Sequence, residues 1–208
     1  KNSILNKFIA QMRDKHIQRD SMRFRRNMER VGEIMAYEIS QRLSYKQRMV
    51  ETPLGIAAVE EIDDKVVIAT ILRAGLPFHQ GFLNYFDDAE SGFVSAYRKS
   101  RPDGSFIVDV EYVSTSSLAG KTLILVDPML STGTSLMLVY DALIRRAGEP
   151  NHTHFAAAFA SELPIEKRRV FWILFRVSGG IFSLISFQQE GGHVFDRESG
   201  YLVEMELT

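Results

Sequence analysis

An acid followed by a run of small residues stands near the middle of the chain, in the stretch TLILVDPMLSTGTS (122–135). Asp127 comes directly after four apolar residues, which are typical of a strand buried on both faces. It therefore lies at the carboxyl end of that strand, where open α/β sheets bind ligands. The small residues that follow let successive backbone amides turn inward before an amphipathic stretch begins at Leu136. This arrangement predicts a phosphate-binding loop at a helix start.

The stretch VDPMLSTGTS resembles the phosphoribosyl-pyrophosphate loop of the uracil phosphoribosyltransferase family, whose members share this run of consecutive residues. Similar segments lie upstream, at ETPLG (51–55), ILRAGLP (71–77) and SAYRK (95–99). The resemblance continues a little downstream through HTHF and AS, between 152 and 161. It covers about residues 13–162, and the C-terminal part departs from it.

The resemblance implies transfer of a ribosyl phosphate from phosphoribosyl pyrophosphate to uracil, which gives UMP and pyrophosphate. Asp127 would accept hydrogen bonds from the ribose hydroxyls and favour positive charge on the ring, while the amides of 129–135 would hold the 5-phosphate. Magnesium would be bound mainly through the diphosphate, and catalysis would rest on positioning and electrostatics. The implied substrate contacts are Arg73, Arg98, Asp127, Pro128, Met129, Leu130, Ser131, Thr132, Gly133, Thr134 and Ser135.

Two arginines in the matching segments would carry the departing pyrophosphate, and with Asp127 they form the implied catalytic set. Arg73 resembles the arginine of the family's pyrophosphate loop, in which a strained peptide after the arginine turns its amide to the diphosphate. Arg98 would be a second contact at the base of a hood. A guanidinium suits this task because it bonds two oxygens at once and keeps its charge. Two points stay open. Arg73 could simply end a strand in solvent, and Lys99 could either help to neutralise the diphosphate or be an ordinary surface lysine.

The elements needed to position these residues can be predicted from apolar periodicity. Strands at 66–72, 93–97, 122–126 and 153–159, with helices between them at 76–88 and 136–146, predict an α/β fold with a mostly parallel sheet. The resemblance refines this to the type I phosphoribosyltransferase fold. We expect one domain over 1–208, with a flexible hood at about 100–118 and an atypical segment at about 163–208. The hood would cover a reaction that water could intercept.

The tail, FQQEGGHVFDRESGYLVEMELT, lacks the segment resembling YIVPGLGDAGD on which the family relies to bind uracil. Uracil-binding residues therefore stay unassigned. Three explanations compete: a reading-frame change near Glu162 to Val170, divergence to another base, or loss of catalysis. The rival to an enzyme is a non-catalytic regulator that senses phosphoribosyl pyrophosphate and binds nucleic acid. Activation by a nucleotide such as GTP also stays open.

Composition excludes several classes of protein. The 208 residues carry a net charge of −1 and no cysteine, which excludes disulfides, thiol catalysis and cysteine-zinc sites. No apolar run approaches the roughly 20 residues that cross a bilayer, and the first residues do not resemble a signal peptide, so we expect a cytoplasmic protein without a membrane partner.

The first 50 residues are basic, but Phe24, Met28, Val31, Met35 and Ile39 recur at helical spacing. This pattern predicts an amphipathic helix with a solvated basic face that contributes to a homodimer or higher homo-oligomer, and not a nucleic-acid partner.

A metal pair is conceivable at His152 and His154, which stand two residues apart on a predicted strand. No third ligand is visible in the sequence. Buried or hydrogen-bonded histidines are therefore the favoured interpretation.

Overall fold

The computed structural model describes residues 3–100, 106–130, 134–160, 171–177, 180–188 and 205–206. An eight-stranded sheet crosses the molecule in the order β12-β10-β11-β8-β6-β3-β4-β5. Its central strands run parallel: β8 (His152–Ala157), β6 (Thr122–Val126), β3 (Val66–Leu72) and β4 (Glu90–Ser100). These correspond to the four predicted strands, and they confirm the α/β class with a mostly parallel sheet.

The outer strands extend this sheet on both sides. β5 (Phe106–Ser114) pairs antiparallel with β4, while β11 (Gly180–Gln188) pairs antiparallel with β8. β10 (Phe171–Val177) forms a hairpin with β11, and β12 (Met205–Glu206) pairs with β10. The two apolar runs of the atypical tail therefore add strands beside β8. The sequence also predicts a short helix at 164–169, and these residues lie outside the described ranges.

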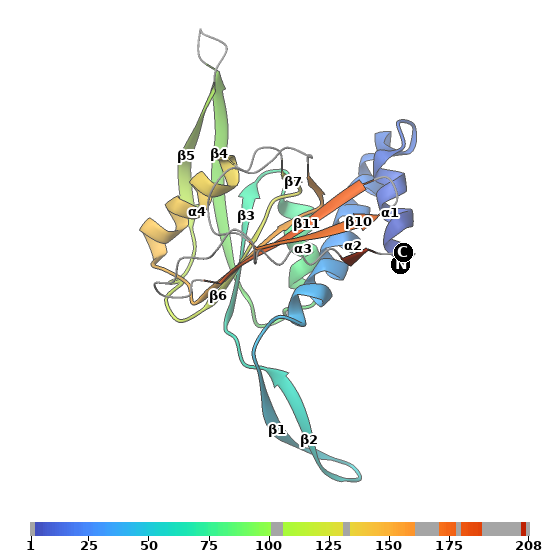
Figure 1. Cartoon of the computed structure of the whole chain (residues 1–208), viewed down its shortest axis with the longest axis vertical. Helices are drawn as coiled ribbons and strands as arrows, with labels where there is room; N and C mark the ends of the chain where they lie inside the picture. Colours follow the sequence, from blue (N-terminus) through green and yellow to red (C-terminus); the bar gives the residue numbers. More distant parts are fainter. Residues whose placement is uncertain are drawn as a thin grey trace, which may run out of the picture.

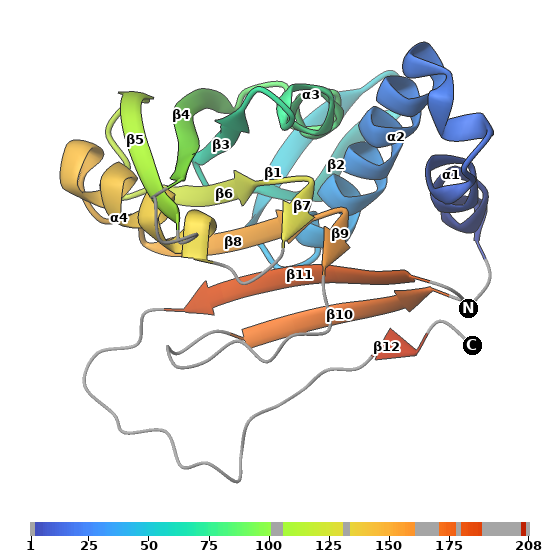
Figure 2. The ribbon, with the colours of Figure 1, turned by 90° about the horizontal axis from the view of Figure 1, so that it is seen from above.

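Helices cover both faces of the sheet (Figure 2). One face packs against α1 (Ile4–Arg13), α2 (Ser21–Ser40) and α3 (Leu76–Leu83), and the other against α4 (Thr134–Ala147). Alternate residues of β6 belong to the two cores, Ile124 to the first and Leu125 to the second. Apolar side chains are required on both faces of such a strand, which explains the unbroken run of β6.

Two glycines let α2 and α3 touch backbone to backbone. A Cβ on Gly81 would lie 2.1 Å from the Glu29 carbonyl oxygen, and one on Gly32 would lie 2.4 Å from the Phe78 carbonyl oxygen. Any side chain at either position would push the helices apart.

The prediction for the end of α3 was wrong, because the helix stops at Leu83 and not at Asp88. Asn84 caps it, and its side-chain amide donates to Glu29 and Glu33 of α2 at 3.0 and 2.8 Å. These bonds hold the chain where it leaves the helix. Phe86 packs in the core although it lies beyond the helix end.

Two hairpins project from opposite ends of the molecule (Figure 1). The first, which we call the arm, consists of β1 (Tyr45–Thr52) and β2 (Gly55–Ile62), paired antiparallel. Thr52, Pro53 and Gly55 are typical turn residues and agree with its turn, but the apolar run after Gly55 gives no sign that the hairpin projects. Ile56 is 73% exposed.

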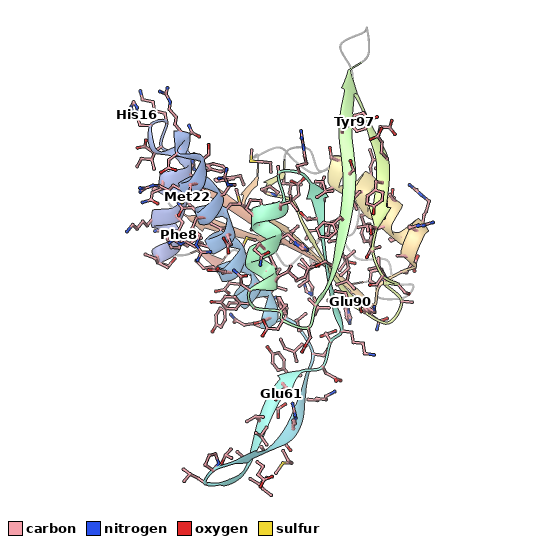
Figure 3. The ribbon with its side chains drawn as sticks, turned by 180° about the vertical axis from the view of Figure 1, so that it is seen from behind. Phe8, His16, Met22, Glu61, Glu90 and Tyr97 are labelled. Atoms are coloured by element: carbon pink, nitrogen blue, oxygen red, sulfur yellow. The ribbon has the colours of Figure 1, made fainter. Side chains whose placement is uncertain are left out.

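The second hairpin is formed by β4 and β5, of which β5 lies within the range predicted for the hood, 100–118. Its register runs from Phe93 opposite Ser114 to Ser100 opposite Phe106, with an irregularity between Ser95 and Ala96. The Tyr97 hydroxyl donates across the hairpin to Glu111 at 2.7 Å (Figure 3). Residues 101–105 of the predicted hood lie outside the described residues.

Candidate active site

The carboxyl ends of the parallel strands meet at one edge of the sheet. Thr70 of β3 lies opposite Val126 of β6, and Leu72 lies opposite Ser95 of β4. Arg73 comes directly after β3 and Asp127 directly after β6, so the two residues lie at the same edge of the sheet. The structure brings together these two predicted site residues, which are far apart in the sequence.

Asp127 comes directly after β6, and its backbone is fixed by β8. Its amide donates to the Ala156 carbonyl at 3.0 Å. Its carboxylate Oδ1 accepts from the Met129 amide at 3.2 Å, and its side chain is half-buried. The acid is thus held by a strand end and by the loop that follows it.

The loop after Asp127 is tied to the end of β8 by a feature that the sequence did not predict. Met129 and Leu130 form a short strand, β7 (Met129–Leu130), parallel to β9 (Phe159–Ala160). The buried Pro128 accepts from the Phe159 amide at 3.0 Å. Met129 is 65% exposed whereas Leu130 is buried, so the two side chains point in different directions.

The helix after this loop starts earlier than predicted. Thr134 and Ser135 are the first residues of α4, where the prediction began the helix at Leu136. The first amides of a helix have no partner within it and therefore suit an anion. The predicted residues Ser131, Thr132 and Gly133 lie outside the described residues.

Arg73 lies in the tight turn that joins β3 to α3, and its side chain is exposed. The peptide between Leu72 and Arg73 is cis, one peptide earlier than the unusual bond that the resemblance implied after the arginine. Gly75 closes the turn, since its amide donates to the Ile71 carbonyl at 3.2 Å and its carbonyl accepts from His79 at 2.9 Å. The turn thereby leads directly into α3.

Arg98 and Lys99 lie in β4, opposite Val108 and Ile107 of β5. This register places both residues in the hood hairpin, beyond the level at which β3 ends at Leu72. Arg98 lies two pairs from the last pair of this hairpin, Ser100 opposite Phe106, and therefore nearer its far end than the base of the hood at which the prediction put it.

The acidic side chains of this edge do not form a metal cage. Within the described ranges, no group of three or more His, Cys, Asp or Glu is placed to hold a metal ion. Magnesium is commonly bound through one or two carboxylates together with substrate phosphates. Asp127 is a carboxylate of this kind, so the described residues fit a metal that arrives with a diphosphate.

The paired histidines lie at the opposite, amino end of β8, away from this edge. His154 is buried, and its Nδ1 has no hydrogen-bond partner among the described residues. Burial, helped by the nearby charge of His152, lowers the pKa of His154 to about 4. The predicted burial is therefore confirmed for His154.

A family model for uracil phosphoribosyltransferase matches residues 1–171. A uracil phosphoribosyltransferase of Porphyromonas gingivalis is 53% identical over 165 residues, which cover 79% of this chain and 76% of that protein. The chain belongs to the uracil phosphoribosyltransferase family. The predicted resemblance is thus confirmed, and the family match extends a few residues past Glu162 into β10.

More distant family members agree. The uracil phosphoribosyltransferase of Methanothermobacter thermautotrophicus is 36% identical over 150 residues, covering 71% of this chain and 68% of that protein. A solved protein of Aquifex aeolicus superposes with a TM-score of 0.66 at 22% identity, covering 78% of this chain and 75% of that one, which supports the fold alone. No helix in the described part of this family member is long and apolar enough to cross a membrane.

Proposed function

We propose that this chain transfers the 5-phosphoribosyl group from phosphoribosyl pyrophosphate to uracil, giving UMP and pyrophosphate. In this reaction the bond from ribose C1 to the diphosphate breaks, a bond from C1 to uracil N1 forms, and N1 loses its proton. The observation that carries the proposal is that Arg73 and Asp127 follow adjacent parallel strands at one edge, in a chain 53% identical to a uracil phosphoribosyltransferase.

Asp127 and Arg73 take opposite parts in the proposed reaction. The carboxylate of Asp127 accepts from the ribose hydroxyls and stabilises positive charge that develops at C1. The exposed guanidinium of Arg73, with Arg98 from the hood, stabilises the charge on the leaving pyrophosphate. Separated charges held by fixed groups are what an electrostatic mechanism requires.

The 5-phosphate is bound where the loop after Asp127 enters α4. The start of α4 at Thr134 supports this assignment, since a helix N-terminus offers amides to an anion. The amide of Met129 already donates to the Asp127 carboxylate. We therefore assign the phosphate mainly to the amides of 131–135 and give the Met129 amide the task of orienting the acid.

Magnesium is proposed as the cofactor, bound mainly through the diphosphate, and Asp127 is the described carboxylate at this edge that would contribute to holding it. When bound, the ion would offset the negative charge of the diphosphate.

The uracil site is tested by exchanging the tail. Binding of magnesium phosphoribosyl pyrophosphate is measured by calorimetry, and UMP formation by a coupled assay. The control chain carries the tail of the Porphyromonas gingivalis relative from residue 162 onward. We expect both chains to bind the sugar diphosphate alike and the exchanged chain to form UMP faster, because the base-binding segment was not found in this tail. Absence of binding by both chains would overturn the proposed function. Equal turnover would mean that the present tail already forms a uracil site.

The finer proposal for assembly is a homodimer formed through the arm. One face of the arm carries four apolar side chains, Tyr45, Met49, Ile56 and Ile62, which are 45%, 62%, 73% and 37% exposed, and the polar Gln47, Glu51 and Glu60 lie between them. Leu54, in the turn between β1 and β2, is completely exposed. An isolated two-stranded hairpin is marginally stable in water, so burial against a partner would stabilise it.

A second copy of the chain is the partner that we propose, because the other face of the arm pairs its charges internally. Arg48 bonds Glu61 at 3.0 Å, and Lys46 pairs with Asp63. A two-fold axis would let the apolar faces cover each other. We expect Leu54→Asp with Ile56→Lys to shift the sedimentation coefficient from dimer to monomer, while Arg48→Gln leaves it unchanged. A wild-type monomer at tens of micromolar would contradict this assembly.

A further inference from the structure

Thr70 is a polar residue in the middle of an apolar strand. β3 reads VVIATIL, and Thr70 is completely buried within it. Its hydroxyl donates to the Val126 carbonyl at 3.2 Å, across the pair that ends the β3–β6 ladder. A buried hydroxyl in a strand is costly unless its hydrogen bond is made, so this bond is a specific feature of the edge that carries the site.

The turn that carries Arg73 packs directly on this threonine. A Cβ on Gly75 would lie 2.0 Å from Thr70 Oγ1 and 2.8 Å from the Ile71 carbonyl oxygen. Only a glycine lets the turn come so close. Thr70 therefore packs directly against the turn that carries Arg73. The Gly75 carbonyl accepts from the His79 amide, which fixes the start of α3.

The same hydroxyl also reaches the backbone of the acid. The carbonyl that Thr70 binds belongs to the peptide joining Val126 to Asp127. The amide of that peptide donates to Ala156 of β8 at 3.0 Å. The peptide is thus held from both sides, by a side chain of β3 and by the backbone of β8. A rotation of this peptide would move the Asp127 carboxylate.

We propose that Thr70 is a positioning residue that fixes Arg73 relative to Asp127. The Thr70 hydroxyl packs against Gly75 in the turn that carries Arg73, and it bonds the peptide that joins Val126 to Asp127. It acts through these two segments without touching substrate. This inference rests on the proposed function, since it assumes that Arg73 and Asp127 act on the two ends of the bond that breaks. A misplacement of about 1 Å can lower a rate by about a hundredfold when reacting groups must be aligned.

The test compares Thr70→Val with Thr70→Ser and with Thr122→Val. Valine keeps the shape of threonine but removes the donor, and serine keeps the donor. Thr122 is the matched control, because it is also a buried threonine of this sheet whose hydroxyl donates a bond, to Asp64 at 2.7 Å, but at the amino end of β6. We expect Thr70→Val to lower kcat about ten- to a hundredfold with a KM for phosphoribosyl pyrophosphate within about twofold of wild type.

The controls separate positioning from stability. Thr70→Ser should recover most of kcat. Thr122→Val should lower the melting temperature as Thr70→Val does and leave kcat within about twofold. In an Asp127→Asn background, Thr70→Val should lower kcat by a smaller factor than in wild type, because the part of its effect that acts through Asp127 is already lost.

A wild-type kcat in Thr70→Val, or an equal loss of kcat in Thr122→Val, would overturn the inference and leave the proposed function standing. If wild type neither binds nor turns over phosphoribosyl pyrophosphate, the proposed function fails and this inference fails with it. If Thr70→Val does not fold, Thr70→Ala replaces it with the same expected loss of kcat.

Discussion

Each end of the β3–β6 strand pair has a threonine and an aspartate, and the partners of these residues differ between the two ends. At the amino end, the Thr122 hydroxyl and the Ser44 amide both donate to the Asp64 carboxylate, at 2.7 and 2.5 Å. At the carboxyl end, the Thr70 hydroxyl donates to a backbone carbonyl, and Asp127 stands half-buried at the start of a loop. Asp64 connects neighbouring strands, whereas Asp127 connects the end of β6 to the loop that follows it, through the Met129 amide.

This difference indicates that the bonds at the amino end stabilise the fold, whereas the carboxyl end holds the side chains to which we assign the reaction. Partial burial pulls the pKa of Asp64 upward, but the hydrogen bonds from Thr122 and Ser44 outweigh it, so the pKa lies below its usual value. The amino end therefore stabilises the native state through satisfied charges. At the carboxyl end, the bonds from Thr70 to Val126 and from Asp127 to Ala156 fix the backbone. The side chains of Asp127 and Arg73 then lie at the edge at which open α/β sheets bind ligands.

The largest effect is expected from Asp127→Asn. The change removes one negative charge beside a developing cation and keeps an acceptor for the Met129 amide. Loss of such a contact commonly costs about 2.7 to 4 kcal/mol, or two to three orders of magnitude in rate. UMP formation should fall by that factor while the urea midpoint stays near wild type. Turnover at the wild-type rate would show that Asp127 does not act at the sugar.

The amino end should be the more sensitive to pH. The pKa of His154 is lowered to about 4 from 6.5, so the unfolded chain binds a proton that the folded chain excludes as pH falls from about 6.5 to 4. Stability should therefore decrease with falling pH in this window, by up to roughly 3 kcal/mol in total. Burial lowers the pKa of His79 as well, which adds a contribution of the same sign.

His154→Phe isolates the contribution of this histidine. The free energy of unfolding, measured with urea between pH 7.5 and 5, should fall less steeply with decreasing pH for the variant than for wild type. The groups that act on His154 are His152, Asp64 and Arg42, and the variant leaves them unchanged. An identical slope in the two proteins would mean that His154 does not keep its proton off in the folded state.

Arg73→Lys tests the carboxyl end more gently. Lysine keeps the charge but loses the planar fork that bonds two oxygens at once. Because Arg73 is exposed, we expect no change in melting temperature. The KM for phosphoribosyl pyrophosphate should rise about tenfold, which corresponds to about 1.4 kcal/mol. Equal KM values would indicate that Arg73 faces solvent and not the diphosphate, which was the alternative interpretation from sequence.

The carboxyl end of β6 could be predicted from the sequence, because consecutive residues there indicate both the strand and the acid that follows it. The run 123–126 followed by Asp127 specified a buried strand and the acid that ends it. The bond from Thr70 to Val126 joins residues 56 positions apart and depends on register, which periodicity does not provide.

The arm and the β7–β9 pair were missed for other reasons. The apolar residues of the arm imitate a buried strand, although Ile56 and Met49 are exposed. β7 and β9 contain two residues each, too few for any periodic signal. A polar residue inside an apolar run was the one available signal for Thr70.

The smallest effect is expected from Asp64→Asn, which is the matched counterpart of Asp127→Asn at the other end of the sheet. The amide oxygen can still accept a bond from Thr122 or Ser44, but without the charge these bonds weaken, which costs about 1 kcal/mol of stability. UMP formation should stay within about twofold of wild type, since the change lies at the amino end of β6. Urea unfolding and the coupled assay, run on both variants, give the decisive pair of measurements. If Asp64→Asn lowered turnover without lowering stability, the two ends of the strand would not divide folding from chemistry in the way that their partners indicate.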